Sequence, residues 1–131
     1  MIGLDTNVLL RAITGDDPVV TPLAEGVLSG LTDAKPGVVN GVVLAELAWP
    51  LRTRYGYART EIAGIIERLT ARSAIHVGDR DAVMAAITRS REEGLDFADA
   101  LIGELNRSAG CSTTLTFDQK AARSTAFTLV A

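Results

Sequence analysis

The stretch MIGLDTNVLL, residues 1–10, decides how this chain folds. Its first four residues are mostly apolar and predict a short buried strand that ends at Asp5. After Asp5, apolar residues recur at helical spacing and predict a helix over residues 7–14: Val8, Leu9, Ala12 and Ile13. An acid at such a strand–helix junction is either the cap of the helix or a functional group. Thr6 or Asn7 could cap the helix instead, which would leave Asp5 free to bind a ligand.

The same reading extends over all 131 residues and predicts one domain, residues 1–131. Helical patterns cover residues 22–31, 42–54, 58–71, 79–93, 96–109 and, briefly, 118–123. Thr21 and Pro22 are expected to begin the first of these, as cap and first-turn residue. Short strands are expected at residues 38–40, 74–77, 113–116 and 127–130. Strands separated by helices predict an α/β fold with a mainly parallel sheet and helices on both faces.

Composition favours a cytoplasmic chain that has a protein partner. Apolar residues make up 47% of the sequence and mean hydropathy is +0.22, which suggests an apolar surface reserved for a partner. No apolar run approaches the roughly 20 residues of a membrane span, and no signal peptide is expected. The single cysteine, Cys111, is expected to be buried and fits a reducing compartment. The single histidine, His76, excludes a multi-histidine zinc site.

Net charge argues against a general nucleic-acid binder. The chain carries a charge of −3 and has a pI of about 5.1, whereas such proteins usually present a basic field. A nucleic-acid substrate would therefore need local cations, a metal ion or a partner. The basic residues nearest the motifs below are candidates for phosphate contacts: Arg11, Arg52, Arg54 and Lys120.

Four acidic residues lie beside or inside apolar runs without an obvious basic neighbour in sequence: Asp5, Glu46, Asp99 and Asp118. Asp5 and Asp118 follow predicted strands, and ligands of parallel sheets gather beyond the carboxyl ends of strands. Carboxylates that converge in a half-buried site repel one another and lose hydration, so they need a cation. Oxygen ligands suit a hard divalent metal ion, which can activate water and stabilise a leaving oxygen.

Each acid also has a simpler interpretation. Glu46 can be an ordinary surface charge, and Asp118 can cap the short helix that follows it. Asp96 is expected to cap its helix, with Asp99 at the third helical position as in a capping box. Gly103, in the same helix, costs about 1 kcal/mol relative to alanine and is expected where another element or a substrate approaches closely.

Four segments together resemble the PIN-domain family in order and spacing, over essentially the whole chain. They are MIGLDTNVLL (1–10), NGVVLAELAW (40–49), DFADALIGELNRSAG (96–110) and TTLTFDQKAAR (113–123). The resemblance implies a PIN-like three-layer α/β/α sandwich with a short, mainly parallel central sheet. The small size is similar to that of VapC-type toxins of bacterial type II toxin–antitoxin systems.

The resemblance also implies an activity and a site. The activity is that of an Mg²⁺- or Mn²⁺-dependent endoribonuclease acting on RNA. The catalytic, metal-binding acids carry over to Asp5, Glu46, Asp99 and Asp118, with Asp5 and Asp99 as principal ligands. Accessory positions carry over to Asp96, Thr6, Asn7 and Thr116. Family members commonly form homodimers and are blocked by a cognate antitoxin that binds near the active site.

Three alternative functions would make different demands on these residues. A phosphotransferase of the haloacid dehalogenase type expects a second Asp two residues after the first, where this chain has Asn7. A response-regulator receiver expects an adjacent acidic pair near the first strand. A non-catalytic PIN-like binding module would use the acids only as caps, and an assay for metal-dependent nuclease activity distinguishes it.

Overall fold

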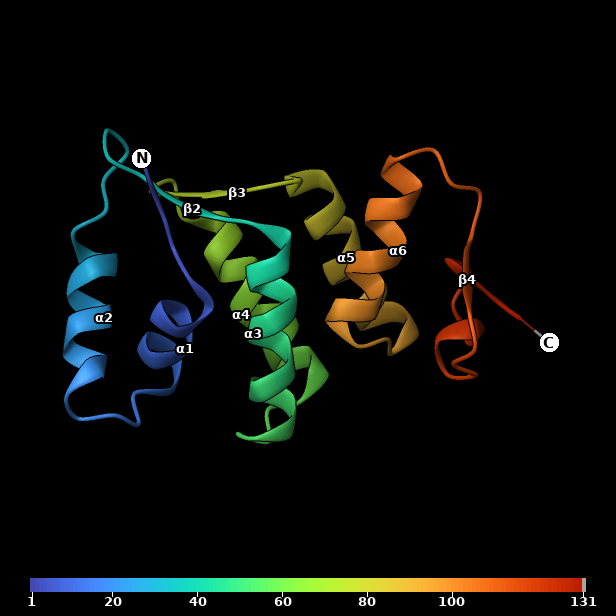
Figure 1. The fold of residues 1–131 in the computed structure, drawn as a ribbon, viewed down its shortest axis with the longest axis horizontal. Coiled ribbons are helices and arrows are strands. Elements are labelled where there is room, and N and C mark those ends of the chain that lie inside the picture. Colours follow the sequence, from blue (N-terminus) through green and yellow to red (C-terminus); the bar gives the residue numbers. More distant parts are fainter. Residues whose placement is uncertain (131) are drawn as a thin grey trace.

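Helices and short parallel strands alternate along the chain in a computed structural model that describes residues 1–130 (Figure 1). The strands are β1 (Ile2–Gly3), β2 (Gly37–Val39), β3 (Ile75–Val77), β4 (Thr114–Thr116) and β5 (Phe127–Leu129). The helices are α1 (Thr6–Thr14), α2 (Val20–Ser29), α3 (Gly41–Thr53), α4 (Arg59–Ala71), α5 (Arg80–Glu93) and α6 (Phe97–Ser108), with a 3₁₀ turn at Ala121–Arg123.

All strand pairs are parallel, and they form two sheets. β1, β2 and β3 pair in that order, with Ile2 opposite Gly37 and Val38 opposite His76. β4 pairs with β5, with Thr114 opposite Phe127. The two sheets lie toward opposite ends of the molecule, with α5 and α6 between them (Figure 1). The expected α/β fold of short parallel strands covered by helices is confirmed, with its strands divided between two sheets.

The core is centred on α3 and α4, which supply side chains without solvent exposure: Leu44, Leu47, Leu51 and Ile66. α3 packs against α1, α4 and α6, so it is the central helix of the molecule. Each fully buried leucine contributes about 1.5–3 kcal/mol through removal of its apolar surface from water. The helix that carries Glu46 is therefore held firmly from three sides.

Three local expectations are wrong. The first strand is not buried, since Ile2 and Gly3 of β1 are both exposed. α2 begins at Val20 because the side chain of Asp17 accepts hydrogen bonds from the backbone N–H groups of Val19 and Val20, both at 2.9 Å. Pro22 consequently lies inside the first turn, where a missing N–H is tolerated. Cys111 is exposed, since it follows α6 in the connection to β4.

Gly103 of α6 is packed against the C-terminal strand. A Cβ atom at this position would lie 3.1 Å from Cβ of Ala126 and 3.2 Å from Cε2 of Phe127. The close approach expected at this glycine is therefore made by Ala126 and Phe127, and it packs the β4–β5 sheet against α6.

We expect Gly103→Val to destabilise the fold by about 1–3 kcal/mol, because extra methyl groups in a well-packed contact force neighbours to shift. Urea unfolding measures the change as a lower midpoint. Gly26→Val in α2 is the matched control, since a Cβ at Gly26 would meet nothing within 4 Å. Equal midpoints for the two variants would contradict this packing role.

α5 is the longest helix at 14 residues. Within residues 1–130, no helix has both the length and the apolar content to cross a membrane.

Candidate active site

Asp5 lies between β1 and α1 and caps the helix. Its backbone is extended, and its Oδ1 accepts a hydrogen bond of 2.8 Å from the backbone N–H of Thr6. Asp5 is thus the cap itself, and neither Thr6 nor Asn7 replaces it. Among the described residues, the second carboxylate oxygen, Oδ2, accepts no hydrogen bond. One oxygen of Asp5 is fixed by the helix and the other is available to a ligand.

Glu46 reaches the same place from α3. The hydroxyl of Thr6 donates a hydrogen bond of 3.1 Å to its Oε1, so Thr6 links Asp5 to Glu46; we name these three residues the Asp5 group. The group lines a groove of about 440 Å³. The other lining residues are Asn7, Leu10, Trp49, Pro50 and Arg54.

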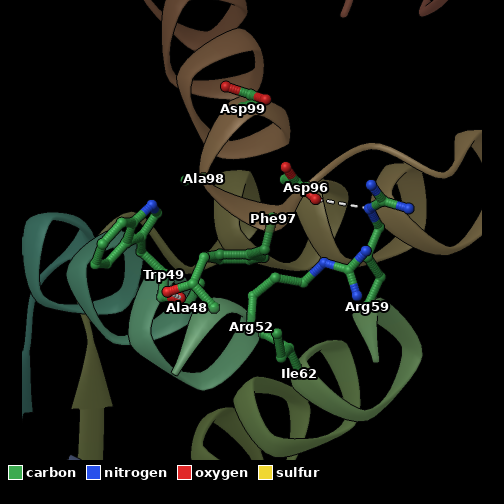
Figure 2. Close-up of a pocket in the computed structure, with 10 residues that line it drawn as sticks. Ala48, Trp49, Arg52, Arg59, Ile62, Asp96, Phe97, Ala98 and Asp99 are labelled. Atoms are coloured by element: carbon green, nitrogen blue, oxygen red, sulfur yellow. Dashed lines mark hydrogen bonds and ion pairs between the residues drawn. The ribbon is translucent and has the colours of Figure 1, made fainter. Parts of the chain in front are cut away.

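A second set of acids lies at the start of α6 and after β4. We name Asp96, Asp99 and Asp118 the Asp99 group. Asp96 precedes α6 but its side chain caps nothing and forms an ion pair of 2.6 Å with Arg59 of α4, so the expected capping box is absent. Figure 2 shows this pair, with Asp99 further along α6. Both acids line a cavity of about 210 Å³ between α3, α4 and the start of α6.

Asp118 follows β4 and caps the 3₁₀ turn. Its Oδ1 accepts hydrogen bonds from the backbone N–H groups of Lys120 at 2.8 Å and Ala121 at 3.3 Å. The hydroxyl of Thr116 accepts one from the Asp118 backbone N–H at 3.0 Å. Thr116 therefore supports the backbone at Asp118 and does not contact its carboxylate.

The carboxyl of Asp99 has a raised pKa. Partial burial raises the pKa of its carboxyl above the ordinary value, and repulsion from Asp96 and Asp118 adds to the increase. Lys120 opposes the effect. Titratable groups shifted by burial and by like charges are typical of functional sites.

This raised pKa predicts a stabilised variant. Because the folded chain favours the protonated acid, stability falls as pH rises from the unfolded pKa near ~3.9 through the higher folded pKa, and stays lower at neutral pH. In chelator-containing buffer we expect Asp99→Asn to raise Tm at neutral pH, with the gain vanishing below ~pH 3.9. Thermal unfolding across pH measures it. Glu25→Gln, an exposed carboxylate on α2, should change Tm little. A lower Tm for Asp99→Asn at neutral pH would contradict the argument.

The structure places these acids in two separate sets, and Trp49 is a neighbour of both. Within residues 1–130, no three acidic, histidine or cysteine residues come close enough to hold one metal ion. Trp49 lines both cavities and so stands between the Asp5 group and the Asp99 group. The expectation of a half-buried cluster is wrong for three of the acids, which are exposed: Asp5, Glu46 and Asp118.

The donor chemistry still suits a hard cation. All candidate ligands are carboxylate oxygens, which Mg²⁺ and Mn²⁺ prefer. Asp96 alone among the five acids forms a salt bridge within the described part of the chain. The chemistry of the donors therefore fits a divalent metal, whereas their spacing in this structure provides two incomplete ligand sets.

The candidate phosphate-binding cations differ in their position and in whether they form an ion pair with an acid. Arg11 is paired with Asp16 at 3.3 Å. Arg54 lines the groove of the Asp5 group, and Arg52 lines the cavity of the Asp99 group. Sequence patterns did not single out Arg59, whose partner Asp96 is 37 residues away. Trp49 was also missed as a site residue, although it follows Glu46 by three residues on α3 and therefore shares its face.

Short parallel strands, with acidic residues after two of them and on adjacent helices, define a small α/β fold. The family model for the PIN domain matches residues 2–127, and the chain belongs to the PIN-domain family. PIN domains are typically metal-dependent nucleases, so the family indicates nuclease activity. Among curated proteins, no relative matches the chain.

Proposed function

We propose that this chain is a VapC-type endoribonuclease that needs Mg²⁺ or Mn²⁺. The observation that carries the proposal is a set of carboxylates without cationic partners in a PIN domain: Asp5, Glu46, Asp99 and Asp118. Burial and the like charges of Asp96 and Asp118 raise the pKa of Asp99, and a divalent cation nearby would relieve that repulsion. When bound, a divalent ion supplies Lewis acidity and charge neutralisation at a phosphodiester.

The residues of the chain have separate roles in this proposal. Asp5 and Asp99 hold the metal, with Glu46 and Asp118 completing its environment directly or through water. Thr6 fixes the orientation of Asp5 and Glu46 through its two hydrogen bonds. Asn7 adds a polar group to the same groove. Arg54 is placed to contact a substrate phosphate, since it lines the groove beside the acids.

Partners form a second part of the proposal. We infer a cognate antitoxin and a homodimer, both supported by apolar side chains left exposed on α2: Val19, Val20, Leu23 and Val27. Exposed apolar patches of this kind mark protein–protein surfaces. The lone cysteine supports a cytoplasmic location.

The decisive experiment is cleavage of a structured RNA pool by purified chain, with Mg²⁺, with Mn²⁺ and with chelator. Metal-dependent cleavage is expected, and it should disappear when chelator is added. If folded protein free of antitoxin cleaves neither this pool nor a pool of total cellular RNA, the chain is a binding module and the proposal is wrong.

A further inference from the structure

Trp49 is an exposed aromatic residue at the centre of the candidate site. It is the only tryptophan of the chain, and 65% of its surface is exposed on α3. Burial of an aromatic side chain is a large source of stability, so exposure here suggests that something else covers the ring. Figure 2 shows the indole at one side of the cavity, across from the start of α6.

The cavity beside Trp49 has an apolar floor and a polar rim. Ala48, Ile62 and Phe97 are buried and form the floor, whereas Asp96 and Asp99 lie on the rim. Its volume of about 210 Å³ lies below the range of drug-sized pockets, which begins near ~300 Å³. The space suits one planar ring system packed beside the indole.

Two arginines follow Trp49 at the end of α3: Arg52 lines the cavity and Arg54 lines the adjoining groove. Arg59 is neutralised by Asp96, but Arg52 has only a contact of 3.4 Å with the carbonyl oxygen of Tyr57. That contact is longer than a usual N–H···O hydrogen bond. Arg54, in the adjoining groove, forms no salt bridge within residues 1–130. An aromatic side chain that lines two cavities, each of which is also lined by an arginine, matches a base attached to its phosphates.

We propose that Trp49 stacks an unpaired nucleobase of RNA, while Arg52 contacts the adjoining backbone phosphate. This specificity site rests on the proposed nuclease function. Because Trp49 lines both cavities, a base held against it places the neighbouring phosphates beside the Asp5 group and the Asp99 group. Paired bases cannot stack in this way, so the site selects single-stranded or looped RNA.

The test uses the fluorescence of the single tryptophan, which reports Trp49 alone. The probes are a uridine oligoribonucleotide of about eight nucleotides, within the usual range of single-strand sites, and an abasic strand of the same length. Chelator is present throughout, so binding is measured without cleavage. We expect the uridine strand to quench the emission and the abasic strand to leave it unchanged.

Variants then separate stacking from general affinity. Binding to variants that lack Trp49 is followed by the fluorescence anisotropy of a dye-labelled strand. Trp49→Leu should weaken binding of the uridine strand about five- to 150-fold, because one stacked base contributes roughly 1–3 kcal/mol, and Trp49→Phe should retain most of it. Arg52→Gln should reduce the dependence of binding on salt concentration. Leu129→Ala, which also removes an exposed apolar side chain but lies on β5 and lines neither cavity, should bind as the wild type does.

Several outcomes would overturn the stacking role. It fails if neither strand binds, if both strands quench equally, or if Trp49→Leu binds normally. It also fails if sedimentation shows that Trp49→Leu alters the oligomeric mass, since Trp49 would then belong to a protein interface. Cleavage with an unchanged KM in Trp49→Leu rejects stacking and leaves the nuclease function standing. Quenching without cleavage under any metal rejects the nuclease function and leaves a base-binding site.

Discussion

Asp5→Asn and Asp99→Asn should each lower RNA cleavage, measured as kcat/KM, by about 10²- to 10³-fold, the usual cost of losing one electrostatic group at a transition state. Each substitution removes a charge and keeps the size of the side chain. Asn caps helices as well as Asp does, so the hydrogen bond to the Thr6 backbone should persist in Asp5→Asn. Cleavage should therefore fall by this factor while circular dichroism and Tm show an intact fold.

Asp96→Asn provides a graded control. Its carboxylate is already paired with Arg59, so we expect a smaller loss of activity than for the two unpaired acids. If Asp96→Asn loses as much cleavage activity as Asp5→Asn and Asp99→Asn do, Asp96 has the same role as those two acids. Normal cleavage by either Asp5→Asn or Asp99→Asn would show that the site has been wrongly assigned.

The double variant Asp5→Asn/Asp99→Asn asks whether the two sets of acids work as one site. If they do, the double variant should lose little more activity than either single variant, because residues that act as a unit are strongly non-additive. Multiplied losses would indicate two independent contributions. The arrangement of the acids in two sets around Trp49 makes this comparison informative.

Local patterns in the sequence were sufficient for most of the secondary structure. Helical periodicity placed α3, α4 and α5, and Gly94 ends α5 in a left-handed conformation, as a helix-terminating glycine does. The start of α2 was misplaced, because Asp17, which accepts hydrogen bonds from its first N–H groups, lies three residues before the first helical residue. Asp17 followed by Pro18 is a local helix-start pattern that competes with the Thr21–Pro22 signal.

Several features at and near the site depend on contacts between residues far apart in the sequence, so local sequence patterns did not predict them. The pairing of Asp96 with Arg59 depends on how α4 packs near α6, which no local spacing encodes. The packing of the β4–β5 sheet on α6 likewise depends on a long-range contact, the one between Gly103 and Phe127. Periodicity identifies the apolar face of a helix, but it does not reveal that Trp49 stays exposed beside that face.

The second large effect should come from Arg89, which joins three segments of the chain. Its guanidinium donates to Glu104 of α6 at 2.7 Å, to Glu93 at 2.9 Å and to Thr125, before β5, at 2.8 Å. The side chains of Arg89 and Glu104 are only 12% and 8% exposed. Loss of Arg89 would leave the Glu104 carboxylate buried without a cation.

We therefore expect Arg89→Leu to destabilise the fold by about 3–5 kcal/mol, the typical cost of removing one partner from a buried ion pair. Arg91→Leu is the matched control, because Arg91 pairs with Glu67 at an exposed position and should cost less than about 1 kcal/mol. Urea unfolding compares the two midpoints.

The double variant Arg89→Leu/Glu104→Leu tests the cause of that loss. Replacing both charges with apolar groups should recover much of the stability, because no buried charge then remains unpaired. Hydrogen exchange should meanwhile show faster opening of β4–β5 in Arg89→Leu, since the contact with Thr125 is lost. As Asp118 lies two residues after the end of β4, this opening should also lower RNA cleavage under conditions where the rest of the domain stays folded. If the midpoint of Arg89→Leu equals that of Arg91→Leu, the buried pair does not stabilise the fold, and Asp118 must be held in place by its own turn.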